Sequence, residues 1–172
     1  MQKDFSYPLK IDELSQNRHH YHLKANAEEC LYLKEILELE GVQSFEADFI
    51  LKKHNKTNML DVEGNLKAVV LQQSVISLEV FEKEYQVPFA YHFDTKMTYN
   101  EFKDMDYGIN DDAPDIIENG QIDLAQMAIE QLALCLDDYP RQTGETFNFV
   151  SEFDEETTKR ANPFSVLQNL KK

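Results

Sequence analysis

Three histidines within four residues, His19, His20 and His22, form the densest group of metal-ligating side chains in the sequence. On a β-strand, His20 and His22 would point to the same face, because side chains alternate along a strand. Zinc takes about four ligands in tetrahedral geometry, and no Cys, Asp or Glu stands at a recognisable ligand spacing from the histidines. We therefore expect residues 13–25 to form an exposed polar loop or an edge segment of a sheet, with no metal site.

The acidic stretch from Asp104 to Asp115 has the density of carboxylates of a calcium-binding loop. Its register is wrong for an EF-hand, because Gly108 is fifth, where that loop requires glycine sixth, and Asp115 takes the place of the twelfth-position Glu. We interpret residues 94–121 as an exposed acidic loop. Its candidate partner-binding carboxylates are Asp104, Asp106, Asp111, Asp112 and Asp115.

No catalytic grouping stands out from the sequence. The 32 acidic residues make chance pairs of carboxylates common. There is no glycine-rich phosphate loop, no nucleophile elbow and no zinc-protease helix. We expect a protein that is not an enzyme, with no cofactor and no metal.

The net charge of −15 is the most informative bulk property. Such a chain repels polyanions at long range and attracts cations, so the charge favours a basic protein partner. The alternative is a small basic patch around Lys52, Lys53 and Lys56 that contacts nucleic acid directly. The sequence has neither a secretory leader nor an apolar run of about 20 residues, which predicts a cytoplasmic protein with no membrane partner.

Hydrophobic patterning predicts an α+β fold: an antiparallel β meander or partly closed barrel packed with two main helices, plus a short C-terminal helix. Residues 4–12, 45–52, 66–81 and 85–93 are predicted strands, with a turn at 62–65. The first helix is predicted at 26–40, capped by Asn26 with Glu29 and stopped near Gly41. The second begins at Asp123, is apolar almost all round, and ends at Tyr139-Pro140. Cys30 and Cys135 are expected to be reduced, buried thiols.

The predicted domain organisation is a single α+β domain at 1–140, a polar linker or extended segment at 141–161, and a short helix or tail at 162–172. Asn162 and Pro163 suit the start of a helix. The apolar face of this tail either packs on the domain or docks into a partner's groove. That face consists of Phe164, Val166, Leu167 and Leu170.

Three segments together resemble the YceD-like family. They are the hairpin-like stretch 61–79, the G-x-I-D-L motif of Gly120, Ile122, Asp123 and Leu124, and the N-P-F-x-V-L tail that begins at Asn162. The G-x-I-D-L residues also have a structural explanation, since Asp123 can cap a helix and Ile122 and Leu124 can enter a core. Many members carry C-x-x-C where this chain has Ser74 and Ser77, and serine does not replace a thiolate as a zinc ligand.

This resemblance implies a ribosome biogenesis factor that supports accumulation of large-subunit (23S) ribosomal RNA. The implied partners are a precursor of the large ribosomal subunit or a basic ribosomal protein, held by the acidic face around 94–118. Direct RNA contact through the lysine patch is the alternative. A metal-dependent RNA-processing enzyme that uses Asp104 and Asp106 is less favoured.

Overall fold

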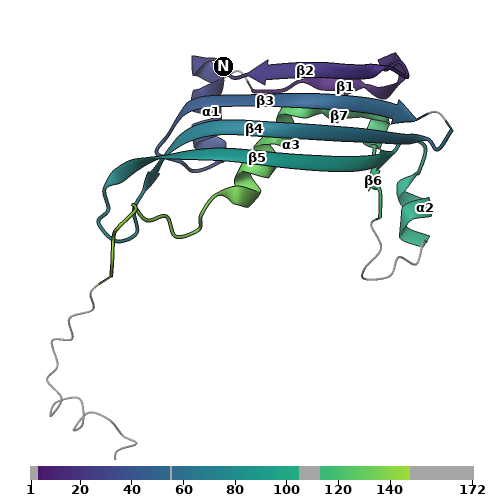
Figure 1. Cartoon of the computed structure of the whole chain (residues 1–172). Coiled ribbons are helices and arrows are strands. Elements are labelled where there is room, and N and C mark those ends of the chain that lie inside the picture. Colours follow the sequence, from purple (N-terminus) through teal and green to yellow (C-terminus); the bar gives the residue numbers. More distant parts are fainter. Residues whose placement is uncertain (1–3, 55, 105–112, 148–172) are drawn as a thin grey trace, which may run out of the picture. The chain divides into compact units, whose positions relative to one another are not determined.

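The computed structural model describes residues 4–54, 56–104 and 113–147 of the 172-residue chain. The chain divides into two compact units, residues 1–142 and 143–172. The predicted tail at 162–172 lies outside the described residues, and everything below concerns the first unit (Figure 1).

An open, five-stranded sheet forms the centre of the first unit (Figure 1). Its strand order confirms the predicted antiparallel meander: β2, β3, β4 and β5 form three successive antiparallel pairs, and the short β6 runs parallel to the end of β5. The sheet does not close into a barrel. The strands are β2 (Arg18–Lys24), β3 (Gly41–His54), β4 (Met59–Gln73), β5 (Val80–Asp94) and β6 (Asp115–Ile116).

The predicted turn at 62–65 is wrong, because β4 runs through it without interruption. Gly64 pairs with Phe49 on one side and Phe89 on the other. A Cβ at Gly64 would lie only 2.2 Å from the Phe89 ring. The glycine therefore marks a close approach between a backbone and a cross-strand aromatic ring. The chain turns on either side of β4 instead, just before Met59 and again at Ser74–Glu79, and the second turn divides the predicted strand 66–81.

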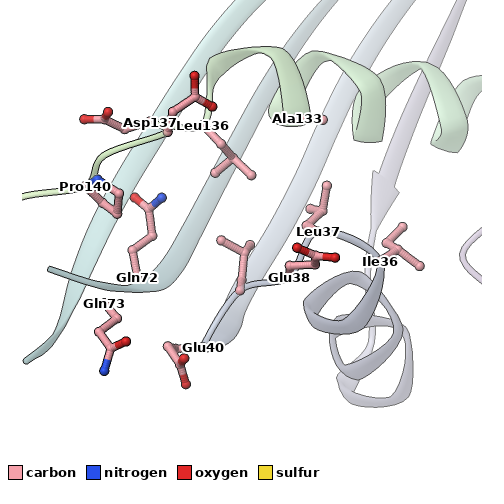
Figure 2. Close-up of a pocket in the computed structure, with 12 residues that line it drawn as sticks. Ile36, Leu37, Glu38, Glu40, Gln72, Gln73, Ala133, Leu136, Asp137 and Pro140 are labelled. Carbon is pink, nitrogen blue, oxygen red and sulfur yellow. The ribbon is translucent and has the colours of Figure 1, made fainter. Parts of the chain in front are cut away.

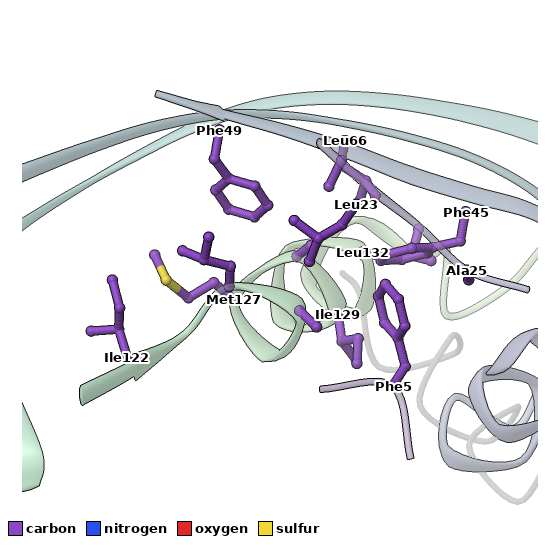
Figure 3. Close-up of a cluster of buried hydrophobic side chains, with 14 of the residues drawn as sticks. Phe5, Leu23, Ala25, Phe45, Phe49, Leu66, Ile122, Met127, Ile129 and Leu132 are labelled. Carbon is purple, nitrogen blue, oxygen red and sulfur yellow. The ribbon is translucent and has the colours of Figure 1, made fainter. Parts of the chain in front are cut away.

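One face of the sheet carries the hydrophobic core. Two helices pack on this face, α1 (Ala27–Ile36) and α3 (Leu124–Cys135). A small second sheet, formed by β1 (Pro8–Lys10) and β7 (Gln121–Asp123), packs there as well. Only three residues of the predicted strand 4–12 are therefore strand, and the 3-10 turn η1 (Ile11–Glu13) follows. The predicted alternation in β3 is confirmed. Figure 3 shows core side chains from the sheet, α3 and the N-terminal segment in contact, among them Phe5, Leu23, Phe45, Phe49, Leu66 and Leu132.

Helix α1 begins as predicted and ends earlier. The Asn26 side chain accepts hydrogen bonds from the backbone N–H groups of Glu28 and Glu29, at 2.9 and 3.1 Å, and the Glu29 carboxylate accepts one from the Asn26 N–H at 2.8 Å. The helix ends at Ile36 rather than near Gly41. Glu38 then adopts a left-handed conformation with φ of 53°, which turns the chain toward β3.

Helix α3 is anchored at its start by Asp123. Its carboxylate accepts hydrogen bonds from the backbone N–H groups of Ala125 at 2.9 Å and Gln126 at 3.1 Å. Six of the twelve helical residues are buried, so the expectation of an all-round apolar helix buried at the centre is wrong at its C-terminal end. There Leu134 is 78% exposed, and Cys135 is exposed rather than buried. Cys30 is buried as expected, and burial raises the pKa of its thiol.

The described part of 94–121 is more ordered than the predicted loop. It contains α2 (Tyr99–Asp104), β6 and the 3-10 turn η2 (Glu118–Gly120). The Asp94 carboxylate accepts hydrogen bonds from two backbone N–H groups of the following turn. The Glu101 carboxylate accepts two from Thr98. These carboxylates therefore hold local structure together. In the described ranges, no helix is long and apolar enough to cross a membrane.

Candidate partner-binding site

The predicted histidine segment is the edge strand β2. His20 and His22 share the open face of the sheet, as expected from their spacing. His22 Nδ1 lies 2.7 Å from an Asp48 carboxylate oxygen on the neighbouring strand. His19 lies on the other face, stacked on Tyr21. Within residues 4–54, 56–104 and 113–147, no three His, Cys, Asp or Glu side chains are placed to hold a metal ion.

The predicted acidic face is only partly described. Asp104 is exposed at the end of α2, and Asp115 is exposed in β6. Burial raises the pKa of Asp115, and the nearby His92 partly offsets this. Asp106, Asp111 and Asp112 lie outside the described residues. So do the tail candidates Asn162, Pro163, Phe164, Val166, Leu167 and Leu170.

The G-x-I-D-L residues have structural roles in the described structure. Gly120 has φ of 67°, a left-handed conformation that favours glycine. Ile122 and Leu124 are 7% and 0% exposed in the core. Asp123 holds the small sheet to the helix, because its carboxylate also accepts hydrogen bonds from the Tyr7 N–H at 2.9 Å and the Ser6 hydroxyl.

A groove with a volume of about 560 Å³ lies where α1 and α3 both end, and acidic residues stand at its rim (Figure 2). We call it the α1–α3 groove. Sequence reasoning missed it, because its two halves lie about a hundred residues apart. The residues that line it are Ile36, Leu37, Glu38, Leu39, Glu40, Gln72, Gln73, Ala133, Leu136, Asp137, Asp138 and Pro140.

The α1 rim of the groove is built by the helix end. The Glu38 N–H donates to Glu35 O at 3.3 Å, and the Leu39 N–H donates to Lys34 O at 3.0 Å. This pair of bonds is the Schellman motif, which normally places glycine at the Glu38 position. Leu39 then turns into the core, 8% exposed, and the Glu40 N–H donates to Leu71 O at 3.0 Å. Glu38 and Glu40 therefore sit on a firmly hydrogen-bonded turn.

The α3 rim is built in the same way from backbone contacts. Leu136 leaves the helix in an extended conformation, and the Asp137 carboxylate accepts a hydrogen bond from the Tyr139 N–H at 3.1 Å. The Val75 N–H donates to Pro140 O at 2.9 Å, which ties the β4–β5 turn to this rim. Lys83 Nζ lies 3.6 Å from an Asp137 carboxylate oxygen.

The electrostatics of the groove favour a cation. Four of its twelve lining residues are acids, and none of the twelve is Lys, Arg or His. The C-terminal end of each helix adds partial negative charge from its unpaired carbonyl groups. Helix α3 has no basic residue in its last turn to offset this, whereas α1 has Lys34. Leu39 and Leu136 give the floor an apolar part between the charged rims, beside Gln72.

The β4–β5 turn beside the groove contains Ser74 and Ser77, the serine pair singled out in the sequence. Ser74 is 1% exposed. Its hydroxyl oxygen accepts hydrogen bonds from the N–H groups of Ile76 at 3.1 Å and Ser77 at 3.3 Å. Ser74 therefore stabilises the turn that borders Gln73 and Pro140.

This geometry defines an α+β protein with an open antiparallel sheet and an acid-rimmed groove at the ends of its two main helices. The family model described as "Large ribosomal RNA subunit accumulation protein YceD" matches residues 62–171, and the chain belongs to that family. The match confirms the resemblance seen in the sequence, and the family's name gives a role in accumulation of large-subunit ribosomal RNA. No curated protein and no solved structure matches the chain.

Proposed function

We propose that this protein supports accumulation of large-subunit (23S) ribosomal RNA by binding a basic ribosomal protein or a precursor particle, without catalysing a reaction. The observation that carries the proposal is the α1–α3 groove, which brings four carboxylates from two distant segments around an apolar floor. The family's name supports the ribosomal role. The net charge of −15 supports a cationic partner.

Charge complementarity explains how such a protein acts. Opposite net charges raise the rate of encounter between two proteins, and that gain falls as salt screens the charges. Ribosomal proteins that bind RNA carry positive charge for contacts with phosphates. An acidic protein that covers this charge prevents indiscriminate contacts with RNA until assembly. The proposal therefore requires a salt-sensitive complex with a basic protein.

A pull-down at two salt concentrations tests the proposal. The tagged full-length protein is mixed with the purified basic proteins of the large subunit, with no RNA present. We expect at least one of them to bind at low salt and to be released at high salt. Retention of ribosomal RNA alone, with no protein contact, would contradict the proposal. Magnesium-dependent cleavage of RNA that is lost on changing Asp104 would favour an enzyme instead.

One observation favours direct RNA contact as a second candidate function. Arg18 and Lys52 lie directly opposite each other on β2 and β3, on the open face of the sheet. Like charges in that position destabilise a sheet, and in the described part of the chain neither forms an ion pair. Of the other two lysines of the predicted patch, Lys53 is less available, because its ammonium donates to Ile11 O at 2.9 Å, and Lys56 is exposed.

The salt dependence of RNA affinity tests this second candidate. If Arg18 and Lys52 contact phosphates, the double change R18Q/K52Q weakens RNA binding and reduces the slope of log affinity against log salt by about 1 to 2. The matched control is the double change K24Q/K67Q, which removes two charges from the same face on β2 and β4. Equal effects of the control and the R18Q/K52Q variant would refute a specific contact.

A further inference from the structure

We propose that the α1–α3 groove binds an amphipathic segment of a basic protein, with an apolar side chain on the groove floor and Lys or Arg side chains against both rims. This inference rests on the proposed function and identifies where and how the partner binds. It concerns a site that the family's name does not describe, formed from residues on both sides of the start of the family match at residue 62.

The apolar part of the surface is larger than the groove floor. Ile36 in the groove is 43% exposed, and Leu134 and Tyr139, which are neighbours in the chain of groove-lining residues, are 78% and 69% exposed. The β4–β5 turn adds Val75 and Leu78, 49% and 67% exposed. This turn is held against the groove by the bond from Val75 to Pro140 and by a bond from the Gln73 side chain to Leu78 O at 2.9 Å. Exposed apolar residues that gather beside a cavity mark an interaction surface.

The charged rims show which kind of partner fits. Figure 2 shows Glu38 and Glu40 after α1 and Asp137 after α3, with Leu136 and Gln72 between Asp137 and Glu40. A segment that lies across Leu136 therefore has carboxylates on both sides. Lysine or arginine flanking an apolar residue matches this arrangement, and arginine can pair with a carboxylate through two parallel hydrogen bonds. The helix ends reinforce the preference for cations within the last turn.

Charge also excludes two other occupants. A second copy of this chain carries the same acidic rims and the same net charge of −15, so two grooves facing each other would repel. Nucleic acid is repelled for the same reason. Asp137 already has Lys83 beside it, but a purely apolar ligand would offer no cation to the other rim carboxylates, and a purely cationic one would leave Leu136 and Ile36 uncovered. An amphipathic basic segment satisfies both parts of the groove.

The test compares two variants of the full-length chain with the same net charge. The groove variant carries E38Q, E40Q, D137N and D138N. The control carries D4N, D12N, E63Q and E84Q, which lie outside the groove. Each set changes the net charge from −15 to −15 + 4 = −11. Fluorescence anisotropy measures the affinity for a short labelled peptide of lysine pairs and leucines, and for the same peptide with serine in place of leucine.

We expect the groove variant to bind the lysine–leucine peptide about tenfold or more weakly, since exposed charge pairs each contribute modestly and four are removed. The control should change affinity by less than about threefold. Ile36→Ser changes an exposed position. It should weaken binding of the lysine–leucine peptide and leave the affinity for the lysine–serine peptide unchanged. Circular dichroism and thermal melts show that each variant is folded.

The outcomes separate this inference from the proposed function. If the two charge variants lose affinity equally, the groove inference is overturned, while general attraction to basic proteins stands. If the wild-type chain binds no basic ribosomal protein and no peptide, both fail. A dimer in sedimentation that the groove variant abolishes would assign the groove to a second copy. Tighter peptide binding by F164S/L167S would assign it to the chain's own C-terminal segment. Either result overturns the inference.

Discussion

Replacing Glu38 by glycine should stabilise the protein and weaken its binding to a basic partner. Glu38 follows the C-cap of α1 with φ of 53°, where its Cβ crowds the backbone. Glycine adopts this conformation freely and is the usual residue at this point of the Schellman motif. A glutamate here has a conformational cost, and its carboxylate reaches the groove rim.

Two contributions set the magnitude. Left-handed backbone costs an L-residue about 1 to 2 kcal/mol relative to the right-handed form, and glycine's greater freedom in the unfolded chain offsets about 0.5 to 1 kcal/mol of the gain. A carboxylate at a helix C-terminus adds an unfavourable interaction of about 0.3 to 1 kcal/mol. Glu38→Gly should therefore raise the free energy of unfolding by about 1 kcal/mol, which corresponds to roughly 2 to 4 °C in Tm for a chain of this size.

Urea unfolding of the wild type, Glu38→Gly and Glu38→Gln measures the two contributions separately. The glutamine variant keeps the strained backbone and removes only the charge, so it should recover the smaller, electrostatic part. The glycine variant should be the more stable of the two. If the glycine variant is no more stable than the glutamine variant, the left-handed conformation at Glu38 has no measurable conformational cost. If glycine leaves peptide affinity unchanged, the Glu38 carboxylate does not contact the partner.

Three further predictions concern the scaffold. Asp123→Ala should lower the free energy of unfolding by about 2 to 4 kcal/mol in urea titrations. The change removes a helix cap and the hydrogen bonds to the small sheet. A loss below about 0.5 kcal/mol would show that the cap is dispensable. Gly64→Ala should destabilise the folded protein by at least about 2 kcal/mol, because the added methyl group clashes with the Phe89 ring. In the double variant, Phe89→Ala should relieve part of that loss. Strictly additive losses of stability in this double-mutant cycle would contradict the contact. For Asp61, burial raises its pKa, but hydrogen bonds from His92 and His54 outweigh burial and hold the pKa below its ordinary value. Its stabilisation is then present above about pH 4 and is lost as pH falls further, so Asp61→Asn should cost stability at pH 7 and progressively less below pH 4; a cost independent of pH would refute the assignment.

Much of the fold could be predicted from local patterns. The alternation of Phe45, Ala47, Phe49 and Leu51 gave β3 its buried face, since side-chain direction in a strand depends on a period of two. The Asn26 cap was equally visible, because its bonds involve residues two and three positions away. Such features depend on near neighbours in the chain.

The errors arose where distant residues determine the structure. Gly64 is a typical turn residue by itself, and only the Phe89 ring on the next strand explains it within β4. The early end of α1 has no glycine signal, because Glu38 occupies the left-handed position. Cys135 continues an apolar pattern, but it is exposed in the last turn of α3, where Leu134 is exposed as well.

The groove could not be predicted for the same reason. Its acids come from two segments that look like ordinary solvated ends of helices, Glu38–Glu40 and Asp137–Asp138. Only the packing of both helices on one face of the sheet brings them together. Sequence reasoning instead selected the densest run of acids, around 104–115, of which the described carboxylates are exposed and separate. Charge density along the chain is a poor guide to charge density in space.

The level of 23S ribosomal RNA in cells that depend on this protein tests the central claim most directly. A strain that lacks the wild-type protein would carry either the groove variant or the control variant of equal net charge, with protein levels matched by immunoblot. The account predicts that the control restores the ratio of 23S to 16S RNA and that the groove variant does not. Full restoration by the groove variant would contradict the claim that the protein acts through this groove.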